Sequence, residues 1–330
     1  MPTIRQIATL LLLAFALPVA AAEYGGRLEG FDYPHPVNTF AFDSQGQTLE
    51  MAYMDVEPET PNGETVLLLH GKNYCAATWE ATITALADAG FRVVAMDQIG
   101  FCKSSKPEHY QFTLHQLAAN TRALLGSLGI EKTHVLGHSM GGMLAARYAL
   151  MYPDATAQLL MLNPIGLEDW KALGVPWRSV DDWFVREKAT TAESIRDYQR
   201  EVYFNGDWKP EYDRWVEMLA GMYAGPEAER VAWNQAQTSD MVFTQPVVYE
   251  FPAIRASTTL FIGQRDRTAI GRDLASPALR ERLGDYPALG LRASRAIPYA
   301  TLVPFEDLGH SPHIEAPARF HNVLLAILRR

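Results

Sequence analysis

Residues 137–141 read Gly-His-Ser-Met-Gly, and this stretch decides the fold. The pattern G-x-S-x-G places a serine hydroxyl on a sharp turn between a strand and a helix, where the glycines permit close approach. The flanking residues fit this placement, because Val135 and Leu136 come before it and an apolar helical stretch continues to Met151. The motif therefore predicts Ser139 as a nucleophile, with the backbone amide of Met140 directed at developing negative charge.

Short apolar runs alternate with helical stretches on both sides of the motif. The runs predict strands that are buried on both faces of a sheet, at residues 66–70, 92–97, 134–139, 159–163, 259–263 and 301–305. The helical stretches are residues 76–89, 113–128, 140–151 and 316–328. Before them, residues 39–42 and 49–54 flank a turn and predict a β-hairpin. This order favours an α/β fold with a mostly parallel sheet, right-handed crossovers and helices on both faces.

Residues 164–253 interrupt the alternation and hold six of the seven tryptophans. Helix starts are expected where Thr190 and Glu193 suit a capping box and where Pro210 and Pro226 suit a first turn. Ordinary packing accounts for most of the aromatic side chains, and some are expected to line a pocket. We therefore predict a helical cap at 164–253, inserted into a core formed by 23–163 and 254–330.

The composition excludes several classes of protein. With 330 residues, 48% hydrophobic and 20% charged, the chain is neither disordered nor fibrous. Its 29 basic residues are scattered and outnumbered by 38 acidic ones, giving a formal charge of −9, which argues against nucleic acid as a partner. Two cysteines without a CxxC spacing argue against a structural zinc site.

Residues 1–22 resemble a secretory signal peptide. Arg5 precedes a short apolar run, and small residues at Ala20, Ala21 and Ala22 suit cleavage. The run is interrupted by Pro18 and is shorter than the roughly 20 apolar residues of a spanning helix, although an uncleaved anchor is the alternative. We predict an exported protein, periplasmic or secreted, that begins near Glu23 and lacks a stable membrane anchor.

Four motifs in order resemble the α/β-hydrolase superfamily over essentially all of the predicted mature chain. Residues 69–71 resemble its oxyanion loop, whose next residue is Lys72, and residues 97–104 resemble its D-x-x-G-x-G-x-S turn with Cys102 replacing the second glycine. The family pattern places a nucleophile at Ser139, an acid at Asp266 and a base at His310. The layout is similar to epoxide hydrolases and haloalkane dehalogenases, which carry Asp where this chain carries Ser.

The resemblance implies a catalytic triad. A serine hydroxyl becomes nucleophilic when an imidazole takes its proton, and a carboxylate must orient that imidazole, which gives Ser139, His310 and Asp266 their expected roles. The amides of Lys72 and Met140 are the expected oxyanion donors. The alternatives are His138 and His313 for the base and Glu306 and Asp307 for the acid; Asn163, where some relatives carry the acid, cannot ionise.

The same fold would place Cys75 and Cys102 just after two neighbouring strands. An exported compartment would let them oxidise, so we predict a Cys75–Cys102 disulfide, with two buried free thiols as the alternative.

These features predict a serine esterase that cleaves a small or medium carboxylic ester through an acyl-enzyme, with an apolar, aromatic-lined pocket above Ser139. No cofactor or metal is expected, and the partner is a small-molecule ester. The same triad could instead act on a lactone, a carbon–carbon bond, a peracid or a peptide. A ligand-binding protein without turnover is the alternative from another class.

Overall fold

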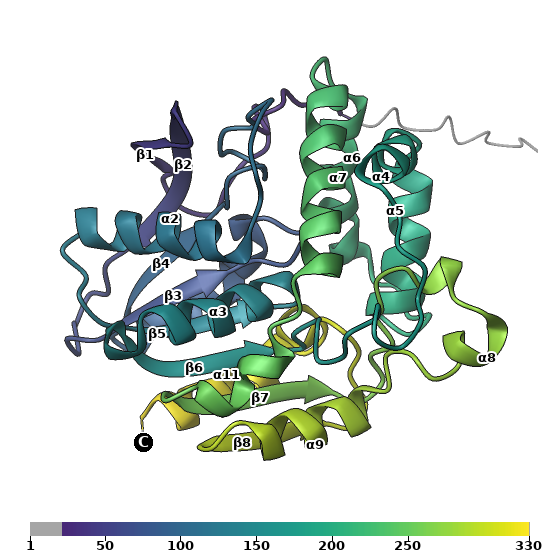
Figure 1. The fold of residues 1–330 in the computed structure, drawn as a ribbon. Coiled ribbons are helices and arrows are strands. Elements are labelled where there is room, and N and C mark those ends of the chain that lie inside the picture. The colour runs from purple at the N-terminus through teal and green to yellow at the C-terminus, as the bar shows by residue number, and fades with distance from the viewer. Residues whose placement is uncertain (1–21, 330) are drawn as a thin grey trace, which may run out of the picture.

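The computed structural model describes residues 22–329, which form an eight-stranded sheet flanked by helices (Figure 1). The strand order is β1-β2-β4-β3-β5-β6-β7-β8. The pairs β1–β2 and β2–β4 are antiparallel and the other five are parallel, which confirms the predicted mostly parallel sheet with a hairpin at its start. The strands are β1 (Asn38–Ser44), β2 (Gln47–Val56), β3 (Thr65–Leu69), β4 (Arg92–Met96), β5 (Thr133–His138), β6 (Thr156–Leu162), β7 (Ser257–Gly263) and β8 (Ala300–Phe305).

Helices cover both faces of the sheet because alternate strand residues point to opposite sides. Leu67 in β3 packs in the same cluster as residues of α2, α3 and α9, whereas its neighbour Leu68 packs with residues of α1 and α11. Both leucines are fully buried. The helices of the two layers are α1 (Glu80–Asp88), α2 (Leu114–Ser127), α3 (Met140–Met151), α9 (Tyr286–Ala296) and α11 (Pro317–Leu328), with short turns α8 (Pro277–Arg280) and α10 (Pro312–Glu315).

Four further helices lie between β6 and β7 in the chain and gather beside one another beyond one end of the sheet (Figure 1). They are α4 (Val180–Lys188), α5 (Ala192–Tyr198), α6 (Asp213–Ala224) and α7 (Ala228–Thr244), and a π-helical turn, η3 (Gln199–Tyr203), continues α5. We call residues 164–253 the cap; its boundaries remain a prediction. Among its tryptophans, Trp183 is buried and lines a cavity, whereas Trp177 is 62% exposed.

The helix starts predicted within the cap are partly wrong. The capping box is formed by Thr191 and Ser194, one residue after the expected pair, because the Thr191 hydroxyl accepts from the Ser194 amide and the Ser194 hydroxyl accepts from the Thr191 amide. Pro226 precedes the N-cap residue of α7 instead of lying in its first turn. Pro210 does open a helical turn, which is the short 3₁₀ turn η4 (Pro210–Tyr212).

A disulfide joins Cys75 and Cys102, as predicted, with their Cα atoms 5.9 Å apart. It connects the loops that follow β3 and β4, which are parallel neighbours in the sheet. Cys102 has a φ of +46°, so the residue that replaces the family's glycine keeps a conformation that glycine favours. Asp97 holds both loops, because its carboxylate accepts from the Ala76 amide at 2.8 Å and the Lys103 amide at 3.0 Å.

The predicted signal peptide falls almost entirely on residues 1–21, which lie outside the described residues. Within residues 22–329, no helix combines the length and the apolar character needed to cross a bilayer.

Candidate active site

Ser139 lies on a strained turn between β5 and α3. Its φ of +55° and ψ of −119° are unusual for a residue with a side chain. The turn is held by the backbone, because the Ser139 amide donates to the Leu162 carbonyl at 3.1 Å and the Ser139 carbonyl accepts from the Gly142 amide at 2.9 Å. The strand-to-helix placement that the motif predicted is therefore present.

Two glycines allow the loop after β3 to approach this turn. A Cβ atom on Gly71 would lie 3.0 Å from the Ser139 Cβ, and one on Gly141 would lie 2.1 Å from the Leu69 carbonyl oxygen. A larger residue at Gly141 would therefore displace the strand end that leads into the expected oxyanion loop. This close approach explains the glycine after the nucleophile in the motif.

The expected oxyanion donors lie on the two segments that meet at Ser139. Met140 is the first residue of α3, so its amide has no acceptor within the helix. Lys72 follows Gly71 in a loop held by the His70 ring, whose Nδ1 donates to the Gly71 carbonyl at 2.8 Å and whose Nε2 accepts from the Gln98 amide at 3.0 Å. The arrangement suits two converging amides, and the assignment of these donors stays a prediction.

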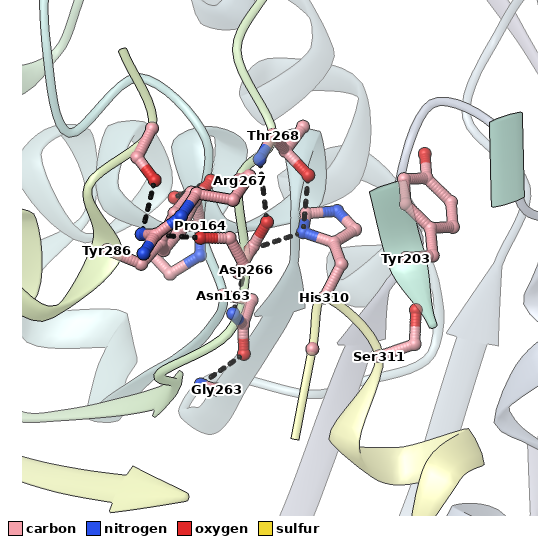
Figure 2. A network of polar contacts seen from close by, with 12 residues as sticks. Asn163, Pro164, Tyr203, Gly263, Asp266, Arg267, Thr268, Tyr286, His310 and Ser311 are labelled. Atoms are coloured by element: carbon pink, nitrogen blue, oxygen red, sulfur yellow. Dashed lines mark hydrogen bonds and ion pairs between the residues drawn. The ribbon is translucent and has the colours of Figure 1, made fainter. Parts of the chain in front are cut away.

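Asp266 and His310 form a buried pair at the ends of β7 and β8. The Asp266 carboxylate accepts from His310 Nδ1 at 2.6 Å, and both side chains are fully buried. The same carboxylate accepts from Asn163 Nδ2 and from the Thr268 amide, each at 2.8 Å. Figure 2 shows Asp266 between Asn163, Thr268 and His310, with Tyr203 beside the imidazole. These contacts orient the carboxylate and restrict its movement.

The second nitrogen of His310, Nε2, is the one that the expected role as a base requires. Because Nδ1 donates to Asp266, the neutral ring carries its lone pair on Nε2. This atom is buried and has no hydrogen-bond partner among the described residues. No Ser139–His310 hydrogen bond is formed among these residues; such contacts are often long in an enzyme without substrate and tighten when it binds.

The alternative acids and bases take other positions. His138 Nε2 donates to the His310 carbonyl at 2.8 Å, and His313 packs against Trp79 with a ring separation of 4.6 Å. Burial, reinforced by neighbouring imidazoles, holds the pKa of both His138 and His313 well below the ordinary value. Among the described residues, neither imidazole forms a hydrogen bond to a carboxylate. Asp307 pairs with Arg319 at 2.6 Å at the surface.

Four residues that sequence reasoning missed hold Asp266 and His310, the expected acid and base. Asn163 was set aside because it cannot ionise, yet it donates to Asp266. Thr268 follows Asp266 by two residues, the spacing of an Asx turn, and its hydroxyl lies 3.1 Å from His310 Nδ1. The Asp-x-Thr spacing could have indicated this contact. No local sequence signal indicates the remaining two residues, Glu315 and Tyr203.

The other two of the four residues, Glu315 and Tyr203, contact the loop and the ring of His310. The Glu315 carboxylate accepts from the amides of Gly309 and Ser311, each at 3.0 Å, on either side of His310. Burial raises the pKa of Glu315 to about 7, although these amides oppose the shift. The Tyr203 ring lies 4.5 Å from the His310 ring, and the Tyr203 carbonyl accepts from the His310 amide at 2.9 Å. The cap therefore contacts the base directly.

A cavity of about 790 Å³ lies between the cap and the core. Lys72 and Asn73 of the expected oxyanion loop line it, as do Tyr198 and Val202 of the cap. The expected apolar, aromatic-lined pocket is only partly right, because the lining also includes six basic and three acidic side chains: Lys72, Lys106, Arg186, Arg267, Arg272, Arg280, Glu187, Glu201 and Asp273. Neither Ser139 nor His310 is among the lining residues, consistent with the burial of both side chains.

Potential metal ligands are close together in one place within residues 22–329. They are Cys75, Asp97 and Cys102, all buried. The two sulfurs are joined to each other, and the Asp97 carboxylate accepts from backbone amides. These atoms are therefore engaged in cross-linking the loops.

Comparison with known proteins agrees with this geometry. A family model described as the alpha/beta hydrolase fold matches residues 64–208. The chain is also similar to a probable hydrolytic enzyme from Pseudomonas aeruginosa PAO1 of known crystal structure, with 62% identity and a TM-score of 0.92 over 93% of this chain and 98% of that one. The fold and the hydrolase class predicted from the sequence are thus confirmed.

Two curated relatives match the chain over a shorter stretch. A 2-hydroxy-6-oxo-6-phenylhexa-2,4-dienoate hydrolase of Comamonas testosteroni is 35% identical over 112 residues, which cover 33% of this chain and 39% of that protein. Epoxide hydrolase A of Mycobacterium tuberculosis is 36% identical over 109 residues, which cover 33% of this chain and 34% of that protein. In both cases the match spans less than half of the relative's length.

Proposed function

Because the chain belongs to the α/β-hydrolase superfamily, we propose that it is an exported serine esterase that cleaves a small or medium carboxylic ester. The observation that carries this proposal is the presence of both a strained turn at Ser139 and a buried Asp266–His310 hydrogen bond. The Nε2 atom of His310 has no hydrogen-bond partner within residues 22–329. A serine at this turn favours an acyl-enzyme, since an ester carbonyl is the electrophile that an alkoxide-like oxygen attacks.

In the proposed reaction His310 Nε2 takes the hydroxyl proton as Ser139 Oγ bonds to the ester carbonyl carbon. The carbonyl oxygen becomes negative next to the amides of Lys72 and Met140, each of which is expected to contribute roughly 3 kcal/mol to the transition state. His310 then gives the proton to the departing alcohol oxygen as the carbon–oxygen bond breaks. Water repeats the sequence on the acyl-enzyme and releases the acid.

Asp266 supports both proton transfers. Its carboxylate fixes the imidazole tautomer with the proton on Nδ1 and stabilises the imidazolium that forms when Nε2 is protonated. Asn163 and Thr268 hold the carboxylate through their 2.8 Å contacts, so little reorganisation is needed during the reaction.

The disulfide supports the export part of the proposal. Disulfides persist in oxidising compartments such as the periplasm and are rare in the cytosol. The Cys75–Cys102 bond and the signal-like pattern of residues 1–22 point to the same compartment. N-terminal sequencing of the secreted protein is expected to start at or near Glu23.

The relatives suggest a second substrate class. One acts on a 2-hydroxy-6-oxo-6-phenylhexa-2,4-dienoate, so the same triad acting on such a dienoate is the alternative to an ester. A screen of para-nitrophenyl esters of increasing acyl length, lactones and this dienoate separates the two. Preferred turnover of a para-nitrophenyl ester supports the proposal, whereas turnover of the lactones alone or of the dienoate alone overturns the ester assignment.

The nucleophile is tested with Ser139→Ala in the full-length protein. We expect ester hydrolysis to fall by on the order of a thousandfold or more, and labelling by a fluorophosphonate probe to disappear. The matched control is Ser127→Ala, which changes an exposed serine at the end of α2 and is expected to keep both readouts. Parent-level hydrolysis by the Ser139→Ala protein would remove the assignment. Labelling without turnover in the parent would favour a ligand-binding protein.

A further inference from the structure

Three arginines line the cavity on the loop that follows Asp266. Resting on the esterase proposed above, we propose that Arg267, Arg272 and Arg280 bind an oxyanion, a carboxylate or a phosphate, carried by the substrate away from its scissile bond. The ligand would be an anionic ester instead of a neutral one. Guanidinium groups suit this role because they present several donors in a plane that matches carboxylate and phosphate oxygens.

The arginines are fixed by backbone carbonyls. Arg272 donates to the carbonyl of Arg267 and, at 2.8 Å, to the carbonyl of Arg280, and Arg280 Nε donates back to the Arg272 carbonyl at 3.1 Å. Carbonyls orient a guanidinium without neutralising its charge. The loop therefore gathers like charges in a fixed arrangement, which costs free energy unless an anion joins them.

These charges have few acidic partners, and the Glu168 carboxylate acts on Arg272 without an ion-pair contact. Within residues 22–329, neither Arg272 nor Arg280 forms an ion pair, and Arg267 has only Asp285 at 3.9 Å. Burial, together with the nearby Arg267 and Arg280, lowers the pKa of Arg272. The formal charge of the chain is −9, so the local excess of positive charge at this end of the cavity contrasts with the whole chain and suits an anion.

The acidic side chains of the cavity are mostly paired elsewhere. Glu187 binds Lys72 at 2.9 Å and also accepts from the Tyr223 hydroxyl. Asp273 is shared by Arg178 and Arg186 at 2.6 and 3.0 Å. The exposed Glu201 is the remaining carboxylate of the lining, so the arginine end keeps a positive excess.

One ligand in this cavity could contact both the arginines and the expected oxyanion loop. Lys72 and Asn73 line the same cavity as the arginines and belong to the loop that packs against Ser139 through Gly71. Arg267 directly follows Asp266 in the chain. A substrate with its ester at the Lys72 end and its charge at the arginine end would therefore be oriented before attack.

The test compares para-nitrophenyl esters of one acyl length that end in a carboxylate, a phosphate or a neutral amide. We expect the parent to hydrolyse at least one anionic ester with a kcat/KM about tenfold or more above that of the amide. This preference is expected to shrink as salt is added, because screening weakens contacts at the partly exposed arginines. Equal kcat/KM values for all three esters would overturn the proposal.

Variants then locate the preference. In Arg272→Gln and Arg280→Gln the anionic-to-neutral ratio is expected to fall about tenfold, and Arg272→Lys is expected to restore part of it. The matched control is Arg282→Gln, since Arg282 is exposed and is not among the cavity-lining residues. A ratio that falls equally in the control, or stays unchanged in both cavity variants, would contradict the assignment whatever the absolute rates.

A binding measurement separates this inference from the esterase proposal. Titration calorimetry of the parent with adipate is expected to show binding that Arg272→Gln weakens about tenfold, with no binding of the neutral adipamide. Such binding without ester hydrolysis would leave the anion site in place and remove the esterase proposal. Ester hydrolysis without adipate binding and without a preference for anionic esters would remove the anion site and leave the esterase proposal in place.

Discussion

The two regions of the site are held by different kinds of contact. Asp266 and His310, the proposed acid and base, lie in the core, fully buried, where contacts that include the Thr268 amide and the Tyr203 carbonyl fix them. The cavity beyond them is lined by partly exposed side chains that meet through ion pairs such as Lys72–Glu187. A reaction needs sub-ångström placement, which backbone contacts supply, whereas selectivity can be altered by exchanging side chains.

This difference predicts that substitutions in the core region change rate or stability, and that those in the cap change rate modestly. The expected effects decrease from Asp266, through Glu315, to Tyr203 of the cap.

The largest effect is expected for Asp266→Asn. The amide removes the charge that fixes the His310 tautomer, so kcat should fall on the order of ten-thousandfold while the fold survives. Hydrolysis of a para-nitrophenyl ester measures the rate, and circular dichroism checks the fold. Asp307→Asn is the control, because Asp307 pairs with Arg319 at the surface, and it should retain parental kcat. Similar rates in both variants would show that the buried carboxylate is not the acid.

The next effect concerns stability and pH through Glu315. Folding raises the pKa of this carboxyl from 4.5 to about 7. The stability that the protonated carboxyl contributes to the folded protein is therefore fully present below pH 4.5 and is lost as pH rises through about 7. Between these values the parent should lose up to about 3 kcal/mol of stability that Glu315→Gln does not lose. Urea unfolding across this pH range measures the difference.

The exposed Glu306 supplies the control for that experiment, since Glu306→Gln should follow the parent. Parallel pH curves for the parent and Glu315→Gln would show that burial of Glu315 does not alter its protonation.

The smallest effect is expected where the cap contacts the base. Tyr203→Leu removes the ring that lies 4.5 Å from His310 and should lower kcat about three- to tenfold, the range of one aromatic contact. Tyr203→Phe keeps the ring and loses the hydroxyl, which accepts from Asn73 Nδ2 at 2.9 Å, so it should retain most activity. Separate kcat and KM values, with a pH profile, check this. A larger loss in the phenylalanine variant would assign the role to the hydroxyl instead.

The core could be predicted from sequence because its signals are local. Buried parallel strands appear as apolar runs, and the run 92–97 differs from β4 by a single residue at its end. The turn at Ser139 combines a strand, two glycines and a helix within a few residues. The sequence analysis did not predict helix α9. Its first turn contains Pro287 and follows a turn-rich segment, and the body of the helix contains Gly290.

The cap and the cavity could not be predicted in the same way. Thr190 and Thr191 are both suitable N-cap residues, and the choice between them depends on packing of the helix that follows. The cavity is assembled from segments far apart in sequence, including Lys72, Tyr198 and Arg272, so no single window contains its charge pattern. The contact between Tyr203 and His310 likewise depends on a π-helical turn that periodicity does not reveal.

The covalent link between Cys75 and Cys102 also bears on how a substrate enters. The loops after β3 and β4 are tied to each other and to Asp97, and both contribute to the cavity wall, through Lys72 and Cys102. These contacts restrain the two loops on this side of the cavity. Widening of the entrance must therefore come from the opposite side, by tilting of the cap helices or movement of the arginine loop.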